Sequence, residues 1–309
     1  MKLIHPYKSF WYLGLLFVGL LTGCQKEKPG PDPEPQLPGF ESSPTVHELA
    51  PDLLHGASGI VDAVNFNRAV WVHNDHDPHL YLISYEAELL KKIPFDGPSH
   101  DWEDMASGPG PDPQVNYLYI AETGDNAEIK TDYFIYRFPE PTEGQEVIDQ
   151  YDTIHFSYSD GKSYDVETLL LDPLTKDLYL LTKRQLSEAS IFKLAYPQNT
   201  TEKTTAEFVK NIPYGVLTSG DISRDGKEIL LKNYVNIYYW KLKDNETILS
   251  ALDRSHDLTP RYIVEPQGEG ICFDKDIRGF FTISEKGSSA DPVKLYHYSK
   301  KLDASSAAL

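Results

Sequence analysis

The sequence predicts an all-β fold of the β-propeller type, and three observations lead to this prediction. Short runs rich in Val, Ile, Tyr and Phe alternate with turn residues throughout the chain after residue 40. A group of three or four such runs recurs five times, which is typical of a repeat architecture. No stretch after residue 40 keeps apolar residues at helical spacing.

Each repeat opens with a short apolar run, and in four of the five repeats a carboxylate stands at the same position of this run, where the first repeat has Gly59. The opening runs are residues 58–62, 101–105, 165–169, 219–223 and 267–271. Turn residues follow each of them, and then come a second run and a third that contains tyrosine.

We expect five four-stranded blades, while the irregular spacing of the repeats leaves a sixth, degenerate blade open. The last repeat lacks a fourth strand, and residues 45–49 can supply it, which would close the ring between the two ends of the chain. Residues 139–152 and 244–260 read as insertions, the second with a helical turn at 248–252. The expected strands are 59–65, 69–73, 79–85 and 88–93; 101–106, 117–122, 133–138 and 152–158; 165–171, 177–182, 191–195 and 207–212; 219–223, 228–232, 237–242 and 261–265; and 268–273, 279–284 and 293–298.

Residues 1–23 read as a lipoprotein signal peptide, with lysines followed by an apolar run too short for a confident membrane span. The run ends in Leu21-Thr-Gly-Cys24, which resembles a bacterial lipobox, so Cys24 would carry lipid; the alternative is an ordinary secretory signal. Residues 24–40 then form a lipidated, proline-rich spacer, and residues 41–309 form the propeller domain. We expect an outer-membrane lipoprotein of a Gram-negative bacterium, periplasmic or surface-exposed.

The chain is strongly acidic, with 47 Asp and Glu against 29 Lys and Arg. Nucleic-acid phosphates would be repelled by this charge, so a nucleic-acid partner is excluded. The membrane, reached through lipid on Cys24, is one expected partner, and the protein is expected to be a monomer. Cys272, in an apolar run, reads as a small buried residue.

The carboxylates of the opening runs form the main candidate site, because first strands line the central axis of a propeller. Four acids on one axis repel one another and need a cation or protonation. Oxygen ligands favour Ca²⁺ over zinc, and the alternative is that these acids only bond backbone amides. The predicted metal ligands are Glu103, Glu167, Asp221, Glu269 and Asn74, with Gly59 at the equivalent position of the first repeat.

Polar residues after the second strands predict a ligand-binding rim at the same end of the channel. A small-molecule or protein ligand would bind there. The rim residues are Asp75, Glu122, Asp125, Asn126, Lys183, Asn233 and Glu285. His73, His76 and His79 offer a second metal site, but alternating strand side chains would not aim all three at one point.

Several motifs together resemble a family of uncharacterised secreted bacterial propellers. They are Val72-His-Asn-Asp75, Asp101-Trp-Glu-Asp-Met105, Gly124-Asp-Asn126, Asp165-Val-Glu167, Gly220-Asp-Ile-Ser223 and Gln267-Gly-Glu269. The axial acids are more distantly similar to those of calcium-dependent lactonases of the gluconolactonase type and of propeller phytases, a likeness at the level of the fold.

Three functions follow as hypotheses. The first is a Ca²⁺-dependent binding module for a ligand or partner. The second is a Ca²⁺-dependent hydrolase of lactones or phosphate esters, with Asp125 or Glu285 as base. The third is a metal-free interaction scaffold.

Overall fold

The described residues belong to the second of two units of the chain, residues 37–309. The structure, a computed structural model, describes residues 39–183, 185–288 and 291–301. They form nineteen strands and one short helix, which confirms the predicted all-β class. The predicted signal peptide, most of the spacer and Cys24 lie outside the described residues. Within them, no helix has the length and apolar character needed to cross a membrane.

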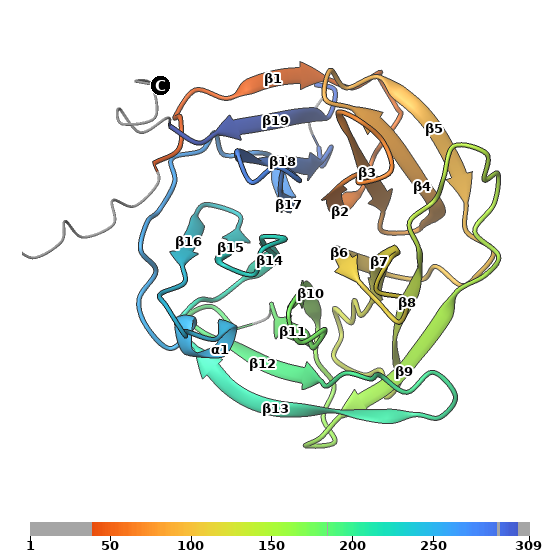
Figure 1. Ribbon diagram of the computed structural model, residues 1–309, viewed down its shortest axis with the longest axis vertical. Coiled ribbons are helices and arrows are strands. Elements are labelled where there is room, and N and C mark those ends of the chain that lie inside the picture. The colour runs from red at the N-terminus through yellow and green to blue at the C-terminus, as the bar shows by residue number, and fades with distance from the viewer. Residues whose placement is uncertain (1–38, 184, 289–290, 302–309) are drawn as a thin grey trace, which may run out of the picture. The chain divides into compact units, whose positions relative to one another are not determined.

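Four sheets are arranged around a common centre (Figure 1). The first sheet contains β2 (Ala57–Asp62), β3 (Ala69–Asn74), β4 (Asp77–Ser84) and β5 (Leu89–Pro94). The eight-stranded sheet has two antiparallel halves, joined where β13 pairs with β9 in parallel. Its halves are β6 (Trp102–Pro109), β7 (Asn116–Glu122), β8 (Tyr133–Pro139) and β9 (Asp152–Tyr158), and β10 (Val166–Leu171), β11 (Leu178–Thr182), β12 (Ala189–Leu194) and β13 (Thr204–Ile212).

The last two sheets differ in how they end. A three-stranded sheet contains β14 (Leu217–Ile222), β15 (Glu228–Asn233) and β16 (Ile237–Lys241), and the helix α1 (Ile248–Ala251) follows it. The remaining sheet contains β17 (Gln267–Phe273), β18 (Gly279–Glu285), β19 (Lys294–Ser299) and β1 (Thr45–Glu48). Because β1 pairs antiparallel with β19, the beginning of the described chain completes the sheet formed by its end, as the sequence predicts.

The strands β2, β6, β10, β14 and β17 lie nearest the centre (Figure 1). Each packs against the next in chain order, and β17 packs against β2, so the inner strands form a closed ring. The inner strands β2 and β10 are buried at every residue, polar side chains included, whereas the outer strand β9 alternates between buried and partly exposed positions. Five apolar clusters fill the spaces between neighbouring groups of strands.

The expected strand at 261–265 is wrong. The three-stranded sheet has no fourth strand among the described residues, and only an isolated bridge joins Tyr239 to Leu258. Pro260 and Pro266 flank this stretch, and proline cannot donate to a strand ladder. The expected helical turn is confirmed as α1, with Thr247 as the N-terminal cap.

Candidate functional site

The register of the inner strands shows which of their residues are equivalent. Each inner strand has an irregularity directly after the residue that pairs with the last residue of the second strand. Counting from these pairs, the first position beyond the paired residue holds Ser58, Glu103, Glu167, Thr218 and Gly268. The next position holds Gly59, Asp104, Thr168, Ser219 and Glu269. Glu103 and Glu167 are therefore equivalent, whereas Glu269 lies one position further along its strand.

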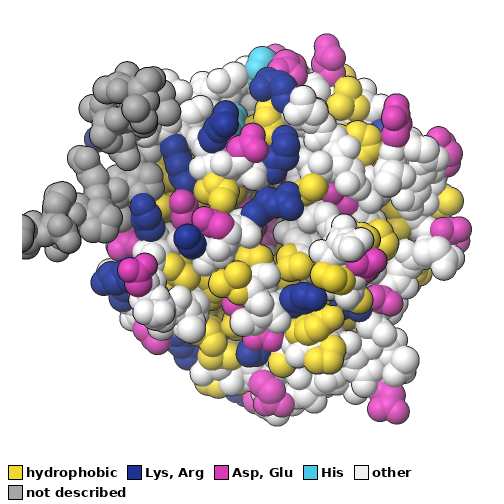
Figure 2. All heavy atoms as spheres, viewed as in Figure 1, with side chains coloured by type: hydrophobic (Ala, Val, Ile, Leu, Met, Phe, Trp, Pro, Cys, Tyr) yellow, Lys and Arg dark blue, Asp and Glu magenta, His cyan; other side chains and the backbone are white. Residues whose placement is uncertain are grey.

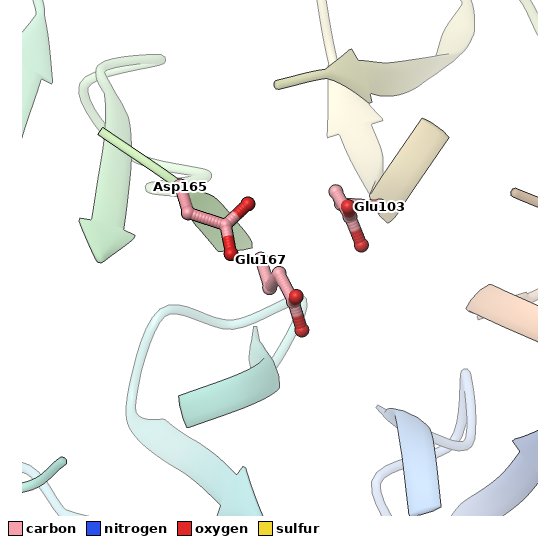
Figure 3. A group of neighbouring side chains, drawn as sticks. All are labelled: Glu103, Asp165 and Glu167. Carbon is pink, nitrogen blue, oxygen red and sulfur yellow. The ribbon is translucent and has the colours of Figure 1, made fainter. Parts of the chain in front are cut away.

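Three buried carboxylates meet at the end of the channel where the inner strands begin; we call this end the acidic mouth. One oxygen from each of Glu103, Asp165 and Glu167 lies within 4.8 Å of the others. Figure 3 shows Glu103 on β6, Glu167 on neighbouring β10 and Asp165 just before β10. Oxygens on opposite sides of a Ca²⁺ ion are roughly 4.6–5.2 Å apart, twice the usual Ca–O distance. The spacing therefore fits a hard cation.

Glu103 is the member of this cluster whose carboxylate has no partner among the described residues. It is 8% exposed, and no other described residue forms a hydrogen bond or ion pair with its carboxylate. Burial raises the pKa of Glu103 well above its ordinary value, and the carboxylates of Glu167 and Asp101 raise it further. A side chain on Gly124 would not fit, because its Cβ would lie 2.2 Å from Glu103 Oε1. This buried carboxylate therefore requires either a proton or a cation.

Glu167, by contrast, has a cationic neighbour. Lys183, which follows β11, donates to the Glu167 carboxylate, and its ammonium lies 5.2 Å from the centre of the Tyr234 ring. The Tyr234 hydroxyl donates to Glu269 Oε1 at 2.9 Å. Burial opposes the charge on Lys183, but Glu167 and Glu269 outweigh this effect and raise the pKa of the lysine. Lys183 is thus a cation held beside the carboxylate cluster.

Asp221 lies outside the carboxylate cluster. By register it is three positions beyond Thr218, the residue equivalent to Glu103, so its predicted place in the acid ring is wrong. Its carboxylate accepts from the backbone N–H groups of Ile222 and Phe273, each at 2.8 Å. Burial, which outweighs these bonds, raises the pKa of Asp221 to about 7. Asp221 therefore links β14 to β17 and does not contact the cluster.

Most predicted residues at the ends of the second strands hold loops in place. Asn74 Oδ1 accepts from the N–H groups of His55 and Gly56 at 3.3 and 3.2 Å. Glu122 accepts from the N–H groups of His100 and Asp101, each at 2.9 Å. Asn233 Oδ1 accepts from two N–H groups of its own turn. These side chains shape the acidic mouth by fixing the chain around it, and their oxygens are already used.

The remaining predicted rim residues fall into two groups. Asp125 is buried and accepts from the N–H groups of Ile129 and Lys130 and from the Tyr133 hydroxyl. It stabilises its own loop, on which Asn126 is exposed. Asp75 is partly exposed and lies 3.6 Å from His76 Nε2. Glu285 accepts from Gln267 Nε2 at 2.7 Å, and burial together with the charges of Glu269 and Asp75 raises its pKa to about 7.

The three histidines do not converge. His73 is fully buried beneath the acidic mouth, where its ring packs edge-on against Trp102 at 5.3 Å. His76 has a largely exposed side chain, and His79 bonds Asp77 on β4. Together they form no common metal site.

Sequence reasoning missed Asp165 as a member of the cluster. Asp101-x-Glu103 and Asp165-x-Glu167 repeat the same spacing, and residues two apart on a strand share a face. That signal could have found it. The fully buried pair of Lys232 and Glu265 was also missed; Nζ lies 3.5 Å from Oε2, and Lys232 donates to the Gly268 carbonyl. Glu265 lies in the irregular stretch 261–265, which the sequence predicts as a strand.

No protein-family model matches the chain. No curated protein matches it in sequence either.

Proposed function

We propose that the ring of sheets is a five-bladed β-propeller whose acidic mouth binds Ca²⁺ and presents a ligand- or partner-binding surface around it. Five inner strands among the described residues support five blades, one with only three strands. Glu103 carries the proposal for the ion, because it is buried within 4.8 Å of two other carboxylates and has no hydrogen-bond or ion-pair partner among the described residues. Glu103, Glu167 and Asp165 would hold the ion, and water or backbone oxygens would complete its coordination.

Glu103→Gln is expected to weaken Ca²⁺ binding about 30-fold, or by about 2 kcal/mol, because it replaces a charged ligand by a neutral side chain of similar shape. Isothermal titration calorimetry with CaCl₂ on the full-length protein in dilute non-ionic detergent measures this. Asp221→Asn is the matched control, since it also neutralises a partly buried acid on an inner strand. It should lower the melting temperature and leave the affinity within about threefold. Equal affinities of the wild type and Glu103→Gln would refute the site.

Lys183→Met is expected to raise the Ca²⁺ affinity at least about tenfold, because the ammonium competes with the ion for Glu167. Methionine keeps the apolar stem of the side chain. Lys130→Met is the control, since the Lys130 ammonium lies 3.9 Å from Asp101 and outside the cluster. Weaker binding by Lys183→Met than by Lys130→Met would mean that Lys183 supports the ion site and does not compete for it.

A Ca²⁺-dependent hydrolase of lactones or phosphate esters is the second candidate. Glu285 favours it, because a partly buried carboxyl with a pKa of about 7 suits a general base at neutral pH. Asp125 is a poor base, since three donors occupy its carboxylate. Turnover on lactone and phosphate-ester panels, lost in Glu285→Gln, would support the enzyme. Ca²⁺ binding without turnover would support the binding module. The absence of both Ca²⁺ binding and turnover would support a metal-free scaffold.

We also propose that the propeller is anchored to the outer membrane through lipid on Cys24, as the Leu21-Thr-Gly-Cys24 stretch suggests. The spacer would hold the domain away from the membrane. Detergent-phase partitioning should therefore be lost in Cys24→Ser, and unchanged partitioning would argue against the anchor.

A further inference from the structure

A second cavity lies at the opposite end of the sheets from the acidic mouth, where the first and last sheets meet. It has a volume of about 1050 Å³, near the upper end of the range of small-molecule sites. Its walls come from the residues before β3 and after β4, the turn between β17 and β18, and β1 and the end of β19. None of the proposed ion ligands contributes to it.

One wall of this cavity is aromatic. The Tyr85 and Phe281 ring centres are 4.6 Å apart, and those of Phe281 and His297 are 4.5 Å apart. Asp274 fixes the imidazole, because its Oδ2 lies 3.1 Å from His297 Nε2 while its Oδ1 accepts from the N–H of Arg278 at 2.8 Å. Phe281 is fully buried, so the partly exposed rings of Tyr85 and His297 form the surface of this wall, with the Arg68 guanidinium 4.9 Å from the centre of the Tyr85 ring. A preformed aromatic surface of this kind suits a flat apolar group.

The charge around the cavity is opposite to that of the whole chain. Arg68, Arg278, Lys300 and Lys301 line it, together with two histidines, against three acids. In Figure 2, Lys and Arg side chains gather over the part of the face where β1, β18 and β19 lie in the same view of Figure 1. Arg68 pairs with Glu86 and Lys300 with Glu228, whereas Arg278 is exposed and has no acid within 4.0 Å among the described residues.

We propose that this cavity binds a small organic anion with a flat apolar body, such as an aromatic carboxylate. The flat body would pack against the partly exposed rings of Tyr85 and His297, and the carboxylate would bind the Arg278 guanidinium, whose donors match a carboxylate in geometry. This site is independent of the ion at the acidic mouth.

The probe is 2-naphthoate, titrated into the full-length protein by calorimetry beside 2-naphthamide, which has the same flat body without the charge. We expect one 2-naphthoate per chain and about tenfold weaker binding of the amide. Arg278→Glu should weaken 2-naphthoate binding at least about tenfold and leave the amide unchanged. Arg261→Glu, at an exposed arginine outside the cavity, is the control and should bind as the wild type does.

Three outcomes would overturn the proposal: no binding at millimolar 2-naphthoate, equal affinities for the acid and the amide, or equal losses in Arg278→Glu and Arg261→Glu. A thermal melt of each variant tests whether the fold is intact. Both arginines are exposed, so both substitutions should leave the melting temperature nearly unchanged. Because no ligand of the ion is changed, Ca²⁺ titration of the same samples reports separately on the acidic mouth.

Discussion

Asp104→Ala is expected to lower the free energy of unfolding by about 4 kcal/mol or more, because it leaves several buried donors without an acceptor. Asp104 is fully buried on β6. Its carboxylate accepts from the Leu169 N–H on β10 at 3.0 Å. It also accepts from the Ser219 hydroxyl at 3.0 Å and the Gly220 N–H at 3.3 Å, both on β14. Each orphaned donor costs about 1–3 kcal/mol.

The effect should spread beyond the strands that Asp104 contacts. The Ser219 hydroxyl that donates to Asp104 also accepts from the Ile271 N–H on β17 at 3.1 Å. One carboxylate and one hydroxyl therefore connect four of the five inner strands. Removing the carboxylate frees the hydroxyl as well, so the loss should exceed that of one ordinary hydrogen bond.

Urea unfolding followed by tryptophan fluorescence measures this loss. Asp244→Ala is the control, since Asp244 is exposed in a turn and its effect should stay within about 0.5 kcal/mol. Asp104→Asn keeps one acceptor oxygen, so its loss of unfolding free energy should lie between those of Asp104→Ala and Asp244→Ala. A loss below about 1 kcal/mol for Asp104→Ala would show that the inner ring does not depend on this carboxylate.

Phe40→Ala is expected to lower the free energy of unfolding by about 3 kcal/mol, because Phe40 packs the closing segment onto the last sheets. Its ring centre lies 5.3 Å from that of Tyr239 and 5.0 Å from that of Phe280. The same segment adds β1 to the edge of β19 and buries Leu49. Deleting residues 39–49 removes all of these contacts and exposes a strand edge, so the deletion should abolish cooperative unfolding.

Thermal melts and limited proteolysis of the full-length variants test this closure. Inserting two glycines after Gly144 is the control, because a side-chain Cβ at this loop position would meet nothing within 4 Å and the loop should tolerate the insertion. A deletion variant with the same melting temperature as the wild type would mean that the ring holds without β1.

Strand positions were predictable because they depend on short-range patterns. Val-, Ile- and Tyr-rich runs bounded by turn residues identified nearly every strand, and a missing strand at one end of the chain indicated that the other end supplies it. The prediction of a strand at 261–265 is wrong because residues of this stretch bond side chains and do not join a strand ladder. Ile263 donates its N–H to the Tyr298 hydroxyl, and Glu265 pairs with Lys232. Composition cannot distinguish such a stretch from a strand.

The sequence by itself determined the class of fold and the closure by residues 45–48. It also placed Glu103 and Glu167 at equivalent positions, since their surroundings repeat along the chain. Only the tertiary structure decided which acids meet. Asp221 lies three positions beyond the residue equivalent to Glu103 and bonds backbone amides, whereas Asp165, just before β10, joins the cluster. The cavity between the first and last sheets likewise arises from residues far apart in sequence. A local pattern fixes which residues form a strand, but the packing of strands against one another fixes which side chains face each other.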